Sequence, residues 1–237
     1  MATDMQTSRT VLVTGAAGNL GRAVANAFAE RGDNLVLVGH RREELAATFG
    51  NETHGRLFAT ADLLDQSRVD GVVRLAIERF GRIDVLCNIA GGFRMGSPVH
   101  QTSDKDWDFM IDINVRTMLN CVRAVVPHMI DRGCGKIVNI GAASAQKGVA
   151  LMGAYVAAKS AVIRLTEAMA AELREKNINV NCVLPTTIDT PQNRADMPKA
   201  DPSRWVAPED LAHVIVFLAS SEARAVHGAA VPVSGLS

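Results

Sequence analysis

The 237-residue sequence lacks the charge and the apolar runs that mark binding to nucleic acids or membranes. Its 25 Lys+Arg balance 25 Asp+Glu, so the formal net charge is zero. Nucleic-acid-binding domains carry a basic surface, and a membrane-spanning helix needs about 20 successive apolar residues. The sequence shows neither feature. We therefore expect a small molecule as the ligand, with no nucleic acid and no membrane as partners.

Cysteine and histidine are too scattered for a metal site or a disulfide framework. The cysteines Cys87, Cys121, Cys134 and Cys182 form no CxxC pair, and the six histidines have no second ligand at metal spacing. Structural zinc sites need closely spaced ligands, and disulfides belong to oxidising compartments. Residues 1–9 are polar and lack the apolar core of a signal peptide. We expect reduced thiols, no metal and a cytoplasmic location.

Short runs rich in Val, Ile and Leu alternate with longer stretches of helical periodicity. Such runs are typical of strands buried on both faces of a parallel sheet. The pattern predicts one α/β domain over residues 1–237, a Rossmann-type doubly wound parallel sheet of about seven strands. Residues 185–207, with four prolines, predict a lid-like loop. The predicted strands are 10–14, 34–39, 56–59, 83–87, 136–140, 179–184 and 229–233, and the predicted helices are 19–31, 41–48, 65–80, 103–131, 153–176 and 208–220.

A glycine-rich segment follows the first predicted strand and leads into a helical pattern. Gly15, Gly18 and Gly21 stand three residues apart. Glycine permits a tight turn there and lets backbone N–H groups approach a pyrophosphate at the start of the helix. The spacing indicates a dinucleotide site. The alternative is that the glycines serve only to pack the helix against the strand.

The end of the second predicted strand indicates which dinucleotide is bound. An acidic residue at this point would hold the ribose 2′-hydroxyl of NAD, but Gly39 stands there and His40 and Arg41 follow. His40 and Arg41 suit a 2′-phosphate, which a carboxylate would repel. NADP(H) is therefore favoured over NAD(H). The alternative is that Arg41 and Arg42 are solvated charges at the start of a helix.

Tyr155, the only tyrosine, stands four residues before Lys159 in a predicted helix, so the two share a face. A free phenol has a pKa near 10, and a nearby ammonium favours the phenolate and lowers that pKa. The pair therefore indicates a general acid or base. The alternative is a surface tyrosine stacked over a lysine stem.

Together these motifs resemble the short-chain dehydrogenase/reductase family along essentially the whole chain. The resemblance implies that Tyr155 donates or accepts the substrate's proton, that Lys159 binds the nicotinamide ribose, and that Asn114 holds a water of a proton relay. It also implies a homodimer or homotetramer. His40 and Arg41 are expected cofactor contacts from their charge, and the resemblance implies the others. The full set is Thr14, Gly15, Gly18, Asn19, Leu20, Gly21, His40, Arg41, Asp62, Leu63, Asn88, Ala90, Gly91, Tyr155, Lys159, Pro185, Ile188 and Thr190.

Three positions depart from the commoner members of that family. Ala142 stands where a serine usually binds the substrate oxygen, with Ser144 as a weak substitute; Asn19 replaces a glycine of the loop, and Thr186 replaces the glycine after Pro185. All three departures occur together in one branch of the family, the quinonoid dihydropteridine reductases, which this sequence therefore resembles. Those reductases usually favour NADH and carry an acidic residue where Gly39 stands.

The missing serine bears on the substrate. Losing one preorganised donor to an oxyanion costs about 2.7–4 kcal/mol. We therefore expect an activated planar acceptor, quinonoid dihydropteridine-like or quinone-like. The alternatives are a generic carbonyl or alcohol oxidoreductase, and a catalytically weak protein that senses NADP(H).

Overall fold

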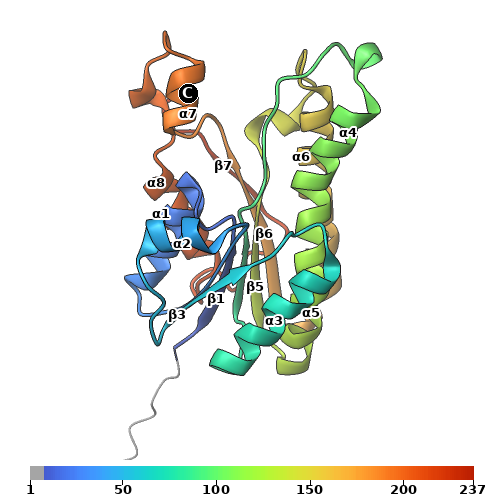
Figure 1. Cartoon of the computed structure of the whole chain (residues 1–237). Helices are drawn as coiled ribbons and strands as arrows, with labels where there is room; N and C mark the ends of the chain where they lie inside the picture. Colours follow the sequence, from blue (N-terminus) through green and yellow to red (C-terminus); the bar gives the residue numbers. More distant parts are fainter. Residues whose placement is uncertain (1–7) are drawn as a thin grey trace, which may run out of the picture.

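The computed structural model describes residues 8–237 and contains a parallel sheet of seven strands in the order β3-β2-β1-β4-β5-β6-β7 (Figure 1). Helices lie on both faces, which confirms the predicted Rossmann-type fold class. Residues 1–7, most of the segment in which the sequence shows no signal peptide, lie outside the described residues. The strands are β1 Thr10–Thr14, β2 Asn34–Gly39, β3 Arg56–Thr60, β4 Val85–Asn88, β5 Gly135–Ile140, β6 Ile178–Pro185 and β7 Ala230–Val233.

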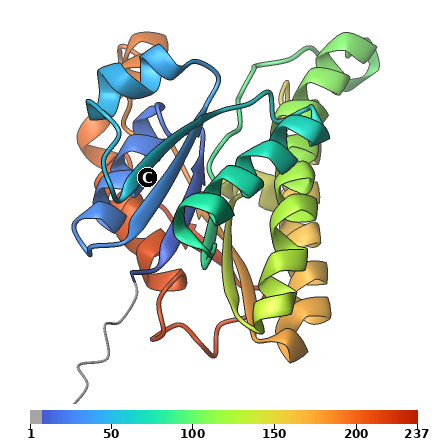
Figure 2. The ribbon, with the colours of Figure 1, turned by 60° about the horizontal axis from the view of Figure 1, so that its bottom comes forward.

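The helices form two layers, with α1 and α8 on one face of the sheet and α3, α5 and α6 on the other (Figures 1 and 2). Within residues 8–237, no helix is long and apolar enough to cross a membrane. The helices are α1 Asn19–Ala29, α2 Arg42–Phe49, α3 Gln66–Phe80, α4 Asp104–Ile111, α5 Thr117–Arg132, α6 Gly153–Leu173, α7 Pro191–Asp196 and α8 Pro208–Leu218.

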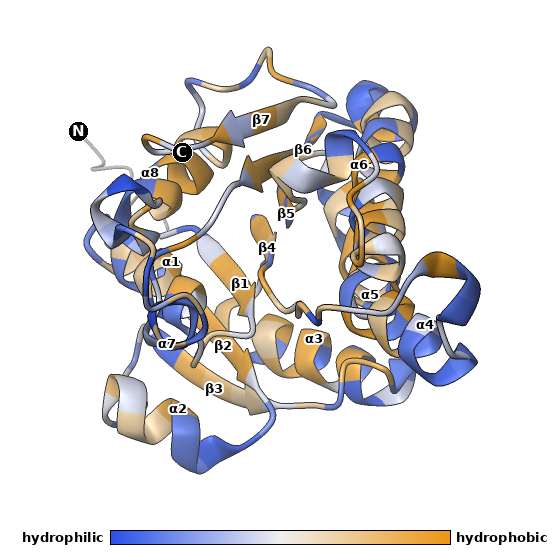
Figure 3. Cartoon of the chain, turned by 90° about the horizontal axis from the view of Figure 1, so that it is seen from above, coloured by the Kyte–Doolittle hydropathy of each residue, from blue (hydrophilic) through white to orange (hydrophobic). Residues whose placement is uncertain are grey.

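The central strands are apolar throughout because both of their faces are covered. In β1, Val11 and Val13 belong to the core that α1 and α8 complete, whereas Leu12 belongs to the core that α3 and α5 complete. Successive side chains of a strand point to opposite faces, so a strand between two helical layers needs an apolar residue at every position. Seen from above, the central strands are coloured mostly hydrophobic and lie between the helices (Figure 3).

The strand order reverses between β1 and β4. From β1 the sheet continues through β2 and β3 to one side, and from β4 it continues through β5, β6 and β7 to the other. In open α/β sheets, ligands bind beyond the carboxyl ends of the strands at such a switch point. The loops that follow β1 and β4 therefore define the expected ligand site.

The predicted helix 103–131 is divided in the structure. Between α4 and α5 the chain forms a π-helical turn, Asp112–Arg116, in which the N–H of Thr117 bonds to the carbonyl of Asp112. Hydrophobic periodicity did not reveal this turn, because one extra residue leaves the chain helical on both sides. π-turns inside helices are frequent at functional sites.

The predicted lid, residues 185–207, is more regular than its prolines suggested. The Thr190 hydroxyl accepts a hydrogen bond from the N–H of Asn193 (3.1 Å) and so caps α7, which begins with Pro191. Ile188 and Val206 form a parallel bridge that joins the two ends of the segment. A Thr-Pro pair is a favourable helix start, so the sequence did contain a signal for α7. Whether the segment closes over a ligand stays a prediction.

Candidate active site

The glycine-rich loop closes tightly on itself and on the segment that follows β4. Gly15 has φ +62°, and a Cβ atom there would lie 3.0 Å from the Cα of Ala90. A Cβ atom on Gly21 would lie 2.2 Å from the carbonyl oxygen of Gly15. Gly18, the N-cap of α1, offers no side-chain cap, and Asn19 begins the helix. The first N–H groups of α1 are thus left for an anion, which is where a pyrophosphate would bind.

Thr14 holds that loop in place from the interior. Its buried hydroxyl accepts hydrogen bonds from the N–H groups of Ile89 and Ala90, both at 3.0 Å. The side chain is therefore turned away from any ligand. Asn88 also points inward: its Nδ2 donates to Oδ1 of Asn139 (2.8 Å), and its own Oδ1 is buried without a partner among the described residues. Both residues support the site from within, so a cofactor contact would have to come from their backbone.

The strand end that follows β2 is open and basic. His40 and Arg41 are exposed, and Arg41 forms an ion pair with Glu44 of α2 across an exposed helix start. No acidic side chain occupies position 39, where glycine stands. An exposed ion pair of this kind is weak, so a 2′-phosphate would compete with Glu44 for the guanidinium.

The segment after β3 provides one exposed and one buried predicted residue. Asp62 is exposed, and its Oδ1 accepts from the N–H of Leu64 (2.9 Å). Leu63 is buried, and its carbonyl accepts from Nδ2 of Asn120 in α5 (2.9 Å). One carboxylate oxygen of Asp62 keeps the turn closed, and the other is free of protein partners in the described chain.

Asn114, Gly91 and Lys159 come together from three separate elements. Asn114 lies buried in the π-turn; its Nδ2 donates to the carbonyl of Gly92 (3.0 Å), and its Oδ1 accepts from the N–H of the same residue (3.1 Å). A Cβ atom on Gly91 would lie 2.9 Å from that Oδ1 and 3.3 Å from Nζ of Lys159. The amide and the amine therefore meet at a point that only glycine leaves open.

Lys159 is buried in α6 with its amine directed at the sheet. Its Nζ donates to the carbonyl of Ile140 at the end of β5 (2.9 Å). Burial lowers the pKa of Lys159 to about 8, and the nearby Cys182 thiol opposes this only in part. An amine with a pKa near neutrality is suited to passing a proton.

Tyr155 lies one turn before Lys159 and packs against the side of the sheet. The ring of Phe93 meets it edge-on, with the ring centroids 4.9 Å apart and an angle of 87° between the planes. Burial raises the pKa of Tyr155 to about 12. The expected lowering of this pKa by Lys159 is therefore wrong for the chain alone, because burial of the phenol is what sets the pKa.

The surroundings of Tyr155 are apolar where the family's serine would stand. Ala142 and Ala145 are buried in a small cluster against which Tyr155 packs. Residues 143–146 form a 3₁₀ turn, and the N–H of Ala145 bonds to the carbonyl of Ala142 (3.0 Å). In a 3₁₀ turn, residues three apart share a side, so Ala145 and not Ser144 lies on the side of Ala142. Ser144 would replace the missing serine only if the chain were extended here, and it is not.

Leu151 is a residue of this region that the sequence analysis missed. Its φ of 61° is left-handed, which is unusual for leucine, and its side chain is 45% exposed. Its carbonyl accepts from the N–H of Gly96 (2.7 Å), which ties the segment before α6 to the loop that carries Phe93. Strained backbone of this kind concentrates at functional sites. No sequence signal points to it, because leucine itself disfavours this conformation.

The glycine-rich loop, the segment with Tyr155 and Lys159, and the π-turn thus lie together beyond the carboxyl ends of the strands. Such a site defines a nicotinamide-dependent oxidoreductase. The chain matches the short chain dehydrogenase family over residues 9–201 and belongs to that family.

Three known proteins illustrate the relationship. The chain is 36% identical over 240 residues to the (2S)-[(R)-hydroxy(phenyl)methyl]succinyl-CoA dehydrogenase subunit BbsD of Thauera aromatica, with 96% of each chain covered. The structure of ElxO with NADP bound has a TM-score of 0.89 at 26% identity, covering 96% of this chain and 98% of that one. The 3-ketoacyl-(acyl-carrier-protein) reductase from Brucella melitensis, complexed with NADH, has a TM-score of 0.84 at 28% identity, covering 96% and 97%. Both forms of the nicotinamide cofactor thus occur among similar folds.

Proposed function

We propose that the protein is an NADP(H)-dependent oxidoreductase that acts on an activated planar acceptor, of the quinonoid dihydropteridine or quinone type. The observation that carries this proposal is the apolar cluster of Ala142 and Ala145 beside Tyr155. Hydride addition to an ordinary ketone builds a localised oxyanion, which needs a second hydrogen-bond donor. An acceptor with delocalised charge needs only one proton donor, which Tyr155 supplies.

Each group of the site has one task in this reaction. The cofactor, when bound, supplies or takes the hydride. The N–H groups at the start of α1 hold its pyrophosphate, and Tyr155 gives a proton to the reduced substrate. Lys159, with its pKa lowered by burial to about 8, passes a proton toward Tyr155, and Asn114 stands beside the amine to hold a water of the relay. Glycine at position 91 keeps the corner beside the Asn114 amide and the Lys159 amine clear, which suits a site that takes up a polar ligand.

Installing the missing serine tests the acceptor class. We expect Ala142→Ser to raise kcat/KM for a simple alicyclic ketone by about tenfold, because a hydroxyl then faces the developing oxyanion. Reduction of a quinonoid dihydropterin should stay within about twofold, since no localised oxyanion forms. Steady-state rates with NADPH and both acceptors measure the difference. Ser144→Ala is the matched control and should change neither rate.

A second candidate is a carbonyl or alcohol oxidoreductase of the generic kind. The Ser144 hydroxyl is half-buried and has no hydrogen-bond partner among residues 8–237, so it is the one hydroxyl of this turn that a substrate oxygen would meet if it bound on the side away from Ala142. The similar protein from Thauera aromatica is named as a dehydrogenase of a hydroxy-substituted succinyl-CoA, and the one from Brucella melitensis as a 3-ketoacyl-(acyl-carrier-protein) reductase. Fast reduction of the ketone by the parent protein, lost in Ser144→Ala, would establish this candidate instead.

The cofactor preference is tested at Arg41. We expect Arg41→Gln to lower kcat/KM for NADPH by about tenfold and to leave that for NADH unchanged, because only NADPH carries the 2′-phosphate. Arg42→Gln is the matched control, since Arg42 pairs with Glu52 and donates to the carbonyl of Phe58 instead. An equal loss with both cofactors, or a parent protein that prefers NADH, would contradict NADP(H) selectivity.

A further inference from the structure

The segment that follows β7, residues 234–237, joins the two ends of the loop 185–207. β7 pairs in parallel with β6, so the segments that follow these two strands leave the sheet at the same end (Figure 1). The segment 234–237 contacts Thr186 at the start of the loop and Arg204 near its end. One short piece of chain therefore holds the loop at both ends.

Thr186 makes the contact at the start of the loop. Its N–H donates to the carbonyl of Val233 (3.1 Å) and continues the bonds between β6 and β7. Its half-buried hydroxyl donates to the carbonyl of Ser234 (2.9 Å). The same hydroxyl lies 2.8 Å from that of Ser237, which also donates to the Ser234 carbonyl (2.8 Å). Glycine, which the commoner members of the family carry here, has no side chain that could form these bonds.

Gly235 and Leu236 make the contact near the end of the loop. The N–H of Leu236 donates to the carbonyl of Arg204 (2.9 Å), and Nη2 of Arg204 donates back to the carbonyl of Leu236 (2.6 Å). Gly235 has φ +59°, and a Cβ atom there would lie 2.8 Å from the carbonyl oxygen of Arg204 and 2.9 Å from that of Trp205. Glycine permits both this conformation and this close approach. The backbone of the segment thus lies directly against the loop.

Ile188, a predicted cofactor contact, lies between these two anchors. It forms a parallel bridge with Val206. The N–H of Val206 donates to the carbonyl before Ile188 (2.9 Å), and the carbonyl of Val206 accepts from the N–H after Ile188 (2.8 Å). Thr186 stands two residues before Ile188, and Trp205 stands one residue before Val206. The segment after β7 therefore fixes the neighbours of both bridge partners.

The loop begins beside the proposed proton donor. Leu184, near the end of β6, belongs to the apolar cluster of Ala142 and Ala145 against which Tyr155 packs. Hydride and proton go to the same substrate, so a nicotinamide would have to lie near Tyr155. The adenosine half would lie at the ends of β2 and β3, beyond the pyrophosphate site at the start of α1. The loop 185–207 is therefore placed to contact the nicotinamide half.

We propose that residues 234–237 form a clamp that holds the loop 185–207 in the shape that binds the nicotinamide, with Thr186 as a positioning residue. The inference rests on the proposed function and on the predicted cofactor contacts at Ile188 and Thr190. The clamp is made within the chain itself, so less conformational entropy is lost when the cofactor binds. Loosening the clamp weakens binding of the nicotinamide half and leaves the adenosine half unaffected.

Two ligands separate the halves: NADPH, and 2′-phospho-ADP-ribose, which lacks the nicotinamide. Thr186→Val removes the hydroxyl, so it should raise the Kd for NADPH by about fivefold and keep that for 2′-phospho-ADP-ribose within about twofold. Gly235→Ala pushes a Cβ atom against the loop and should raise the Kd for NADPH by about tenfold with the same selectivity. Calorimetric titration measures each Kd.

Two variants are the controls. Thr186→Ser keeps a hydroxyl and should bind both ligands within about twofold of the parent. Gly81→Ala is matched to Gly235→Ala, because Gly81 also has a left-handed φ of +72°, but a Cβ atom there would meet nothing within 4 Å among residues 8–237. Gly81→Ala should therefore lower stability and change neither Kd.

The proposal is overturned if Thr186→Val and Gly235→Ala bind NADPH as the parent does, if both ligands lose affinity equally, or if Gly81→Ala shows the same selective loss. The readout is binding, so it does not depend on which acceptor is reduced. If the parent prefers NADH, NADH and ADP-ribose replace the two ligands. A failure of the proposed NADP(H) preference is then seen separately from a failure of the clamp.

Discussion

Replacing Tyr155 by phenylalanine is expected to lower kcat by about a thousandfold and to leave the Kd for NADPH within about threefold. The phenol is the chain's only tyrosine hydroxyl, and the neighbouring Ala142 and Ala145 offer no second proton donor. Phenylalanine keeps the ring that packs against Phe93, so the fold and the cofactor cradle should survive. Single-turnover rates with a quinonoid dihydropterin, together with calorimetric titration of NADPH, measure the two effects.

A second hydroxyl on the same helix provides the control for this result. Ser160 follows Lys159, and its Oγ donates to the carbonyl of Ala145 (2.9 Å). Ser160→Ala removes a hydroxyl near the site without touching the proton path, so kcat should fall by less than about threefold. If Tyr155→Phe keeps most of the activity, the proton donor lies elsewhere. If the parent binds NADPH but reduces no acceptor, the sensing alternative replaces the enzymatic one.

The strands were predictable because they are buried on both faces. β1 and β2 match the predicted ranges 10–14 and 34–39 residue for residue, since an unbroken apolar run admits few other structures. Strand boundaries were less predictable, because an apolar run does not show where the hydrogen-bonded ladder starts. The predicted strand 83–87 corresponds to β4, which begins at Val85. The backbone of Asp84 already bonds to the carbonyl of Thr10 (2.8 Å) and to the N–H of Lys136 (2.9 Å), so the difference is one of assignment at the strand end.

The site was predictable as a set of motif positions but not as a set of orientations. The sequence places Thr14 and Asn88 beside the cofactor loop, yet their side chains turn inward to bind backbone and Asn139. The direction of a side chain depends on which distant element packs against it, and no local pattern contains that information. Ser144 illustrates the same limit, because a short 3₁₀ turn places Ala145 where an extended chain would place the serine.

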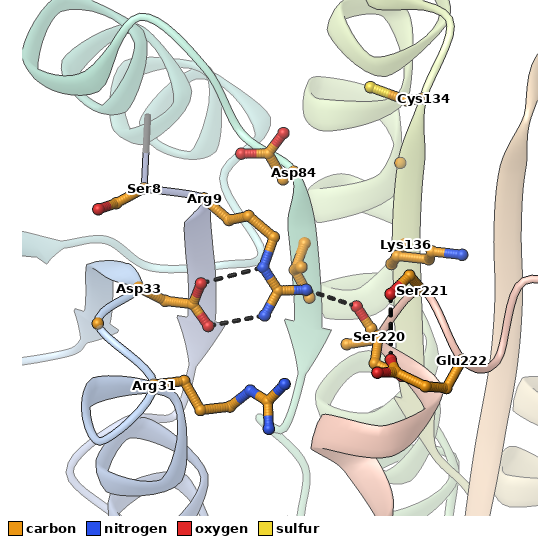
Figure 4. A pocket seen from close by; sticks show the side chains of 14 residues that line it. Ser8, Arg9, Arg31, Asp33, Asp84, Cys134, Lys136, Ser220, Ser221 and Glu222 are labelled. Atoms are coloured by element: carbon orange, nitrogen blue, oxygen red, sulfur yellow. Dashed lines mark hydrogen bonds and ion pairs between the residues drawn. The ribbon is translucent and has the colours of Figure 1, made fainter. Parts of the chain in front are cut away.

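A cavity of about 810 Å³ at the amino ends of the strands had no sequence signal at all (Figure 4). Arg9, Asp33, Asp84 and Lys136 come from four separate parts of the chain and form no motif. They meet because the amino ends of parallel strands lie at one edge of the sheet, as the carboxyl ends with Tyr155 lie at the other. The same geometry that brings the candidate site together at one end of the strands brings charged side chains together at the other. Only the structure shows that the cations and the carboxylates there are equal in number.

Lys159→Met is expected to stabilise the chain at pH 7 by about 2 kcal/mol while it abolishes turnover. Burial lowers the pKa of Lys159 from 10.5 to about 8, so below pH 8 the amine is charged in both the folded and the unfolded chain, and the cost of burying it is fully present. Methionine keeps the unbranched stem and removes that charge. The lost bond to the carbonyl of Ile140 offsets part of the gain.

The pH dependence of stability separates this electrostatic origin from a general packing effect. Between pH 8 and 10.5 the unfolded parent binds more protons at Lys159 than the folded one, so its free energy of unfolding should rise with pH, by about 3 kcal/mol in total. Above pH 10, Tyr155 opposes this rise, because its pKa of about 12 in the folded chain exceeds its ordinary value of 10. Urea unfolding at pH 7 and pH 9.5 should therefore show a gap between parent and Lys159→Met that narrows with pH. If the difference in free energy of unfolding between parent and variant is the same at both pH values, or if the variant is less stable than the parent at pH 7, the amine is not both charged and buried. Lys105→Met, with its exposed amine, should show no such change in the gap.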